Sequence, residues 1–240
     1  LGGGGGVPKG ASALGAPMVI NPEAPASVPV LDIYEDPQCP ACASMEKVYG
    51  AAIADLAKTN KAKVVVHTMV FLDTNLKNDS SVRAAIGAFC AADQGTFLDY
   101  MVAVYAGQPK QEGVGFTDTQ LEAFAMASRV GSLPTWQQCV KDKTYKAHAI
   151  AGNEAAFKEG ITGTPTFFDD RQGVKGLEAL HARIRYEEFN GVPSLRQPQL
   201  SLKPFDRDRL IKVALKLRSI HPDLAAEEAE RRVPRELVEQ

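Results

Sequence analysis

Two cysteines separated by two residues form the most reactive pattern in the sequence, Cys39-Pro40-Ala41-Cys42. Such a pair can hold a metal ion, close a structural disulfide, or exchange electrons with another dithiol. Which chemistry applies depends on the elements that position the two sulfur atoms. The pair lies between an apolar segment and a long amphipathic one, so these two elements are considered first.

The residues around the pair follow a strand–helix–strand pattern. Residues 28–34 (VPVLDIY) are largely apolar, as in a strand covered on both faces. Residues 63–72 (KVVVHTMVFL) predict a second buried strand, and residues 18–20 a short one. Between the two long strands, apolar residues recur at the spacing of one helix face: Met45, Val48, Tyr49, Ala52, Ile53 and Leu56. Parallel strands joined by a helix form a βαβ unit.

The cysteines therefore fall where the first long strand ends and the helix begins. Backbone N–H groups and the dipole at a helix N-terminus stabilise a thiolate at Cys39. Pro40 has no N–H group and suits the first helical turn. Cys42, one turn later, is placed to attack a mixed disulfide formed at Cys39. A C-x-x-C pair in this context indicates redox chemistry.

The rest of the chain continues with helices and returns to a strand. Helical patterns cover residues 81–93, 97–106, 117–130, 135–145 and 153–158, and residues 161–168 (ITGTPTFF) have strand character around a proline. Further along, residues 171–198 show no clear period. Residues 199–203 alternate like a half-buried strand, residues 206–220 predict an amphipathic helix, and residues 221–240 form a charged tail.

These motifs resemble the DsbA-like thiol–disulfide oxidoreductases, an α/β class with a thioredoxin-like fold and an inserted α-helical domain. The matching residues are Asp36-Pro37-Gln38-Cys39-Pro40-Ala41-Cys42 and Gly163-Thr164-Pro165-Thr166. The resemblance implies a thioredoxin-like domain made of residues 18–72 and 161–220, with an irregular insertion at 171–198. Residues 73–160 would be the helical domain. From composition, residues 1–17 are expected to form a flexible Gly-rich tether and residues 221–240 a charged tail.

The resemblance also assigns roles to individual residues. Cys39 and Cys42 would be the catalytic thiols, and Pro165 would be a cis-proline packed against them. Thr164 would offer its backbone to the substrate chain, with Pro40 and Ala41 completing the substrate-binding surface. An ordinary trans proline opening an edge strand is the alternative for Pro165.

The second cysteine pair, Cys90 and Cys139, fits exported members of this family that carry a disulfide in the helical insertion. Such a bridge would close a loop of about 50 residues and stabilise the fold by on the order of 4 kcal/mol. Two buried free thiols are the alternative, because Cys90 lies in the apolar run AAIGAFCAA.

One departure from the family concerns the buried proton acceptor. The family often has a carboxylate six residues before the first cysteine, where this chain has Ile33. Glu35 has the same strand parity as Ile33 and is a candidate proton acceptor. The sequence nevertheless favours a solvated loop acid for Glu35, next to Asp36.

The resulting hypothesis is an enzyme that introduces disulfide bonds into exported proteins. Its substrates would be reduced, unfolded proteins, and a quinone-linked membrane protein of the DsbB or VKOR type would reoxidise it. The strong oxidant of the family has His between its cysteines, so Ala41 predicts a milder oxidant. We expect an extracytoplasmic monomer without cofactor or metal, tethered by an anchor that preceded Leu1; an expression scar is the alternative for the Gly-rich start.

Other functions fit the sequence less well. A net charge of −2 gives no sign of nucleic-acid binding. A structural zinc site needs four ligands in closely spaced pairs, and Cys90 and Cys139 are far apart. A Cys–His hydrolase would need a base near Cys39, and His67 lies within a predicted strand. A disulfide reductase or isomerase with the same fold remains the main alternative.

Overall fold

The computed structural model describes residues 6–169, which fall within the first of the two units, residues 1–174 and 175–240, into which the chain divides. The predictions for residues 171–198, 199–203, 206–220 and 221–240 therefore lie outside the described residues. Within residues 6–169, no helix combines the length and apolar character needed to cross a bilayer.

A four-stranded mixed sheet forms the centre of the described unit, in the order β1-β3-β2-β4. The parallel pair β2 (Val30–Glu35) and β3 (Lys63–Thr68) is flanked by two antiparallel neighbours, β1 (Met18–Val19) and β4 (Thr166–Asp169). In register, Tyr34 lies opposite both His67 and Thr166. The four strands predicted within the described residues are present with shifted ends: β2 runs one residue further than expected, through Glu35, β3 ends at Thr68 rather than at residue 72, and β4 begins at Thr166 rather than at residue 161.

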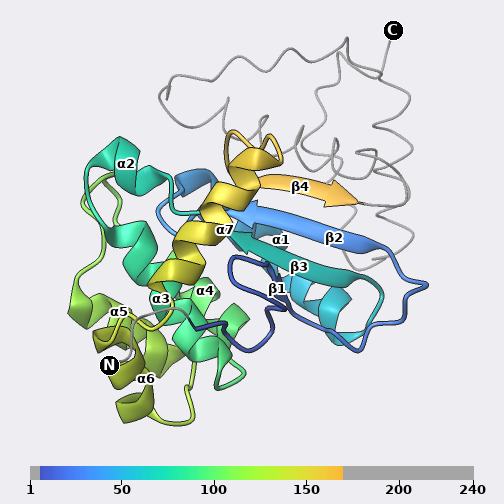
Figure 1. The fold of residues 1–240 in the computed structure, drawn as a ribbon, viewed down its shortest axis with the longest axis horizontal. Helices are drawn as coiled ribbons and strands as arrows, with labels where there is room; N and C mark the ends of the chain where they lie inside the picture. The colour runs from blue at the N-terminus through green and yellow to red at the C-terminus, as the bar shows by residue number, and fades with distance from the viewer. Residues whose placement is uncertain (1–5, 170–240) are drawn as a thin grey trace, which may run out of the picture. The chain divides into compact units, whose positions relative to one another are not determined.

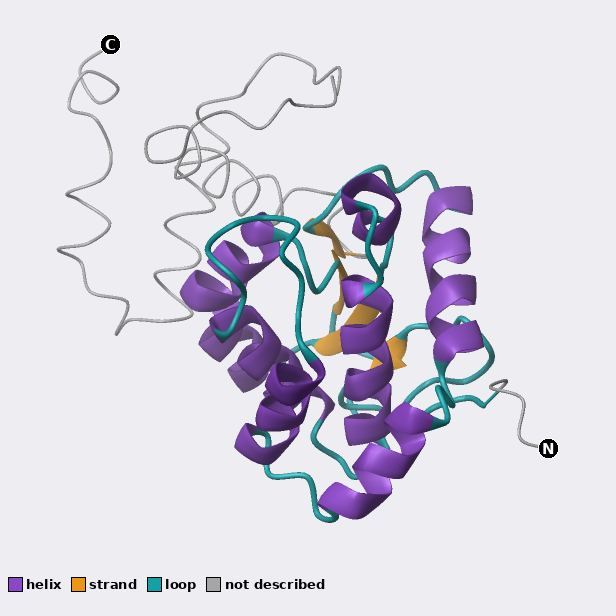
Figure 2. Ribbon diagram, turned by 90° about the vertical axis from the view of Figure 1, so that its left-hand side faces the viewer, coloured by secondary structure: helices purple, strands orange, loops and turns teal. Residues whose placement is uncertain are grey.

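Helices cover both faces of this sheet. In Figure 1, α1 (Pro40–Lys58) lies behind the strands and α7 (Lys146–Lys158) lies in front of them. Figure 2, turned by 90°, shows the strands enclosed by helices on both sides. Because side chains alternate along β2, Ile33 and Glu35 face α1, whereas Tyr34 packs towards α7 with Met69 and Ala156.

The helices between β3 and β4 form a layer around one buried helix. They are α2 (Leu72–Leu76), α3 (Ser80–Ala92), α4 (Phe97–Ala106), α5 (Asp118–Ala127), α6 (Leu133–Lys141) and α7. Helix α3 is buried along nearly its whole length and contacts α4, α5, α6 and α7, as expected for a helix whose residues 84–92 are apolar or small on all sides. The thioredoxin-like fold with a helical insertion is thereby confirmed.

Helix boundaries differ from the predictions where side chains cap the helix ends. Helix α5 begins after Thr117, whose hydroxyl and the side chain of Gln120 form a capping box. Helix α6 begins at Leu133 rather than at residue 135, because Ser132 caps it and Pro134 fits its first turn. Helix α7 starts seven residues earlier than expected, and the short α2 was not predicted.

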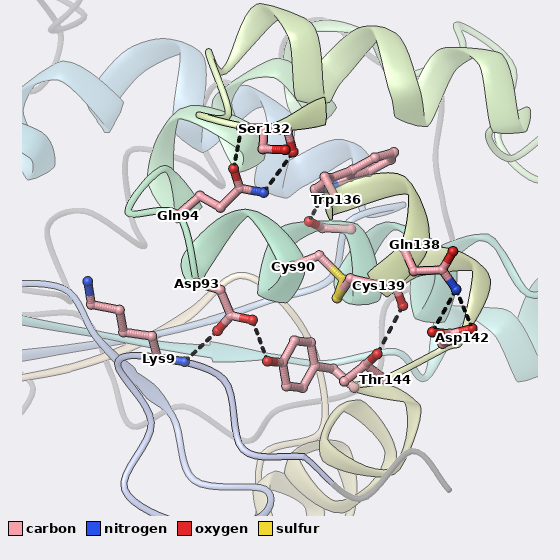
Figure 3. The surroundings of a disulfide bond; sticks show 12 residues. Lys9, Cys90, Asp93, Gln94, Ser132, Trp136, Gln138, Cys139, Asp142 and Thr144 are labelled. Atoms are coloured by element: carbon pink, nitrogen blue, oxygen red, sulfur yellow. Dashed lines mark hydrogen bonds between the residues drawn. A yellow bond between two sulfur atoms is a disulfide. The ribbon is translucent and has the colours of Figure 1, made fainter. Parts of the chain in front are cut away.

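The predicted disulfide between Cys90 and Cys139 is present and joins α3 to α6 (Figure 3), so these two sulfurs are not the alternative free thiols. Trp136 lies beside it and donates its indole N–H to the carbonyl of Gly87 at 2.8 Å. The backbone of Ser132 also pairs with the side chain of Gln94 in both directions. Helix α6 is therefore fixed to α3 and to the residues just after it, by the disulfide near its end and by hydrogen bonds nearer its start.

Residues 6–17, expected to belong to a flexible tether, instead lie against the helices. The N–H of Lys9 donates to Asp93 at 3.0 Å, as Figure 3 shows, and the N–H of Gly15 donates to Nδ1 of His148 at 3.0 Å. Pro8 is fully buried. A Gly-rich composition indicates a tether only when nothing fixes the chain, and here specific hydrogen bonds do.

Candidate active site

The two cysteines lie where β2 gives way to α1, as predicted. Cys39 is the N-cap residue of α1, and Pro40 occupies the first helical position. Cys42 follows one turn later, and both cysteines are buried free thiols. Cys39 Sγ therefore lies at the N-terminus of α1, and the backbone N–H of Cys42 helps to lower the Cys39 pKa, as expected at a helix N-terminus.

The loop before β4 completes the surroundings of Cys39. The Thr164–Pro165 peptide bond is cis, and Cys39 Sγ lies 3.4 Å from the carbonyl oxygen of Thr164. This distance joins residues that are 125 positions apart in the chain. The pair and the proline loop, which were recognised separately in the sequence, thus form one site.

The two thiols have opposite protonation preferences. The hydrogen bond from the Cys42 thiol lowers the pKa of Cys39 more than burial raises it, and the side chain of Thr164 adds to the lowering. Burial, together with the hydrogen bond to Cys39, raises the pKa of Cys42 well above its ordinary value. Within the pair, Cys39 is therefore the thiolate and Cys42 keeps its proton.

Glu35 is buried beside these thiols, and the prediction that it is a solvated loop acid is wrong. It belongs to the last position of β2 and is only 5% exposed. Burial, and then the nearby Glu46 carboxylate, raise the pKa of Glu35 to about 8. The charge of Glu35, when it is ionised, also raises the pKa of Cys42, so Glu35 is a buried acid that interacts with the dithiol.

Tyr105, at the end of α4, accompanies Glu35. Its hydroxyl group is buried and makes no hydrogen bond of good geometry to the described residues, yet it lies close enough to Glu35 to lower that group's pKa. Burial and the charge of Glu35 raise the pKa of Tyr105 well above its ordinary value. A neutral phenol is thus available to the Glu35 carboxyl group.

A buried polar network, not predicted from the sequence, anchors the loop before Cys39. Asp36 is fully buried and accepts hydrogen bonds from the N–H groups of Gln38 (2.9 Å) and Leu72 (3.1 Å) and from the hydroxyl of Ser81. Gln38 Nε2 donates to Asp73, at 2.9 Å, and to further oxygens on Asn78 and Ser81. Burial raises the pKa of Asp36 to about 7 against these donors.

Asp73 extends this network to α3. Its carboxylate accepts hydrogen bonds from the N–H groups of Ser81 (2.7 Å) and Val82 (2.8 Å), which belong to the first turn of that helix. The active-site loop is thereby tied to α2 and α3. In the sequence, the polar residues of Asp36-Pro37-Gln38 just after a buried strand were the one sign of this network. Their hydrogen-bond partners lie some 35–45 positions away, so the network could not be predicted from the local sequence.

The other residues considered in the sequence lie elsewhere. His67 pairs with Asp32 at 2.8 Å and stacks on Tyr34, on the α7 side of the sheet, so it is not a base for Cys39. Cys90 and Cys139 are bonded to each other and are not available to complete a zinc site with Cys39 and Cys42. Pro40 and Ala41, expected to bind substrate, lie in the first turn of α1.

A family model described as Thioredoxin matches residues 15–190, which is more than half of the chain. The chain belongs to the thioredoxin family. A second model, described as the BREX system ATP-binding protein BrxC/D, matches residues 148–240, most of which lie outside the described residues.

Solved structures place this thioredoxin-family chain among DsbA-like folds. The MdbA thiol-disulfide oxidoreductase from Corynebacterium diphtheriae is similar with a TM-score of 0.59 and 21% identity, covering 73% of this chain and 92% of that one. MdbA from Actinomyces oris has a TM-score of 0.55 and 25% identity, with coverages of 68% and 79%. BdbD from Bacillus subtilis has a TM-score of 0.56 and 19% identity, with coverages of 75% and 97%.

A curated relative is much longer than this chain. The serine/threonine-protein kinase PknE of Mycobacterium tuberculosis is 28% identical over 149 residues, which are 58% of this chain and 26% of that protein. The chain thus spans about a quarter of the relative that it matches. Together with the solved structures, the family model confirms the resemblance to DsbA-like thiol–disulfide oxidoreductases that the two motifs indicated.

Proposed function

We propose that this protein oxidises pairs of cysteine thiols in exported proteins by exchanging its own Cys39–Cys42 disulfide. The observation that carries the proposal is the contrast between the two thiols: Cys39 has a lowered pKa at the start of α1, whereas Cys42 has a raised one. A stabilised Cys39 thiolate favours the reduced protein, so the disulfide form is the oxidant. The site residues Cys39, Cys42, Thr164 and Pro165 keep the roles that the resemblance implies.

The first step is an attack by a substrate thiolate on Cys39 Sγ of the protein disulfide. A substrate–Cys39 bond forms, the Cys39–Cys42 bond breaks, and Cys42 leaves with the electron pair. A buried Cys42 thiolate is unfavourable because its pKa is raised, so it needs a proton. Glu35, which is mostly protonated at pH 7, is placed to supply that proton.

The second step releases the product. The substrate's second thiolate attacks its own sulfur in the mixed disulfide, the substrate disulfide forms, and Cys39 leaves as the stabilised thiolate. The substrate has lost two electrons, and the protein holds them as a thiolate and a thiol. When a membrane reoxidant removes these electrons, Glu35 takes the Cys42 proton back, which is the proton-acceptor role expected for it.

Thr164, Pro40 and Ala41 would bind the substrate chain around Cys39. The carbonyl of Thr164 already reaches Cys39 Sγ, at 3.4 Å, so an extended substrate strand beside it would bring its sulfur to the same place. The MdbA and DsbA-like folds support an extracytoplasmic location for this chain, where oxidised thiols persist. A monomer reoxidised by a quinone-linked membrane protein completes this proposal.

Single-cysteine variants and a redox titration test the function. We would mix each variant with a peptide whose single cysteine is disulfide-bonded to a chromogenic thiol. In Cys42→Ala the Cys39 thiolate should attack the peptide sulfur, release the chromogenic thiolate and accumulate as a mixed disulfide with the peptide, whereas Cys39→Ala should accumulate none. The oxidised wild-type protein should convert a reduced, unfolded protein to its disulfide form. Its reduction potential should lie above the value of about −270 mV typical of thioredoxin.

The same measurements separate the main alternative. A reductase would show a potential near or below the thioredoxin value and would leave the reduced substrate unchanged while reducing disulfides. An isomerase would rearrange scrambled disulfides faster than it forms new ones. Absence of any mixed disulfide with Cys42→Ala would remove the proposal altogether.

A further inference from the structure

Gln108 reaches the active-site loop from the helical insertion. It lies two residues beyond the end of α4, and its side-chain amide is partly buried. Nε2 donates one hydrogen bond to the carbonyl of Pro37 at 2.8 Å and another to the carbonyl of Cys39 at 3.0 Å. A side chain some 70 positions away in sequence thus holds the backbone on both sides of Gln38.

These carbonyl groups matter because they adjoin a sulfur atom that is to carry negative charge. A carbonyl oxygen is the negative end of its dipole and opposes a thiolate, whereas a backbone N–H favours it. The carbonyl of Cys39 also accepts the N–H of Ala43 at 3.2 Å, which is the first hydrogen bond of α1. A donor that fixes these oxygens therefore also fixes the orientation of the first amides of the helix.

We propose that Gln108 is a positioning residue of the dithiol site, which keeps the carbonyls of Pro37 and Cys39 engaged so that the amides opening α1 face the sulfur. The inference rests on the proposed function and deepens it, because it gives the helical insertion a direct part in setting the redox properties of the pair. It also supplies partial positive charge near Cys39 in a chain whose Ala41 has none to offer.

The position of Gln108 suits this role. Gln108 follows Tyr105 by three residues, and the N–H of Gln108 donates to the Tyr105 carbonyl, so both side chains come from one turn. Tyr105 lies beside Glu35 while Gln108 holds the loop before α1. The titratable groups that face Cys39 are Cys42 in α1, Asp36 in the preceding loop, Glu35 at the end of β2 and Tyr105 at the end of α4.

Two substitutions of Gln108 form a graded test. Gln108→Ala removes both hydrogen bonds, and Gln108→Glu keeps the shape while replacing the donor with a carboxylate. We expect the Cys39 pKa, followed by thiolate absorbance against pH, to rise by about half a unit to one unit in Gln108→Ala, a three- to tenfold change in the thiolate equilibrium. It should rise further in Gln108→Glu, and the equilibrium with glutathione should shift towards the protein disulfide in the same order.

Gln138→Ala is the matched control. Gln138 lies on the exposed face of α6, and its amide donates to Asp142, at 2.9 Å from each carboxylate oxygen. This variant also loses an amide that donates two hydrogen bonds, but on α6 and not at the loop that carries Cys39, so its Cys39 pKa and its glutathione equilibrium should match the wild type.

The stabilities of the oxidised and reduced forms keep the test decisive even where a variant is weakened. If Gln108 made a purely structural contact, its loss would lower the free energy of unfolding of the oxidised and reduced forms equally and leave the Cys39 pKa unchanged. That result would overturn the inference. A larger loss in the reduced form supports it. If the wild-type protein oxidises thiols while both Gln108 variants keep its pKa, this inference fails and the proposed function stands; if the wild type exchanges no disulfides, the function itself fails.

Discussion

Burial raises the pKa of Glu35 to about 8, so at pH 7 most of this group carries a proton and adds little negative charge next to the two thiols. The sequence identified Glu35 by its parity with Ile33 but could not decide whether it is buried, because β2 could have ended one residue earlier. The register with β3, in which Glu35 lies opposite Thr68, decides the question. The local sequence around Glu35 does not reveal this pairing, because the partner strand is about 30 residues further along the chain.

Glu35→Gln should make the stability of the oxidised protein less dependent on pH. The folded-state pKa of Glu35 lies above its ordinary value of 4.5, so its contribution is fully present below about pH 4.5 and is lost as the pH rises through about 8. A neutral Gln avoids this loss. At pH 9 we expect the variant to be more stable than the wild type by on the order of 3–5 kcal/mol relative to their difference at pH 4.5.

Urea unfolding of both proteins between pH 4.5 and pH 9, with the Cys39–Cys42 disulfide closed, measures this difference. Glu159→Gln provides a control, since Glu159 accepts the hydroxyl of Tyr34 on the other face of the sheet. If the free energies of unfolding of wild type and Glu35→Gln changed with pH in the same way, the folded protein would not raise the pKa of Glu35, and the prediction would be wrong.

At the scale of elements, the sequence located α1 and its cysteines well because three signals coincide there. An apolar strand ends, a proline occupies the first helical position, and a long apolar face begins with Met45. The helical insertion was harder to delimit. Residues 84–92 of its central helix α3 are apolar or small on all sides, so they show no amphipathic period, and α5 and α6 begin at side-chain caps rather than at a change of period.

The disulfide between α3 and α6 should stabilise the insertion without setting the redox chemistry. Replacing both Cys90 and Cys139 with Ala should lower the free energy of unfolding by about 2–5 kcal/mol, because the unfolded chain gains a long open loop. The Cys39 pKa should stay the same, since the pKa of this thiol responds to Cys42, Thr164 and Asp36. Denaturant unfolding and thiolate absorbance give the two readouts.

A loss of stability without a change in the Cys39 pKa would match this prediction. A changed pKa would mean that the bridge reaches the active site through α3, whose first turn is bound by Asp73. Trp136 fluorescence offers a local check, because the indole N–H is bonded to α3 in the same region.

At the scale of the described unit, residues 6–169, the N-terminal segment and the helical insertion pack against each other. Residues 6–17 contact the helices through Pro8, Lys9 and Gly15. Composition suggested a tether because glycine-rich chains are usually flexible. The partners that order the segment, Asp93 and His148, are far away in sequence and could not be recognised from it.

Gly15→Ala tests this packing. Gly15 has a φ of +76°, and an added Cβ would come within 2.8 Å of Ala151 in α7. We expect the free energy of unfolding to fall by at least about 1 kcal/mol, with faster amide exchange at the start of the chain. Gly131→Ala, where a Cβ has room and φ is not positive, should change little.

Unchanged stability and exchange in Gly15→Ala would show that the segment is held only loosely. A drop in stability equal to that of Gly131→Ala would have the same meaning. Thermal unfolding with amide exchange by mass spectrometry distinguishes these outcomes.

The alternation of side chains along β2 assigns different tasks to its two acids. The side chain of Asp32 lies on the face of the sheet where it pairs with His67, and the side chain of Glu35 lies on the opposite face, next to the two thiols. Ile33 shares that second face, so an acid moved two residues back by Ile33→Glu with Glu35→Ile would still lie under the helix. Two residues along a strand span roughly 6.6 Å, so the moved acid would lie about that far from its present place beside the Tyr105 phenol. The exchange would thus separate the acid from the phenol while leaving the two sulfurs in place.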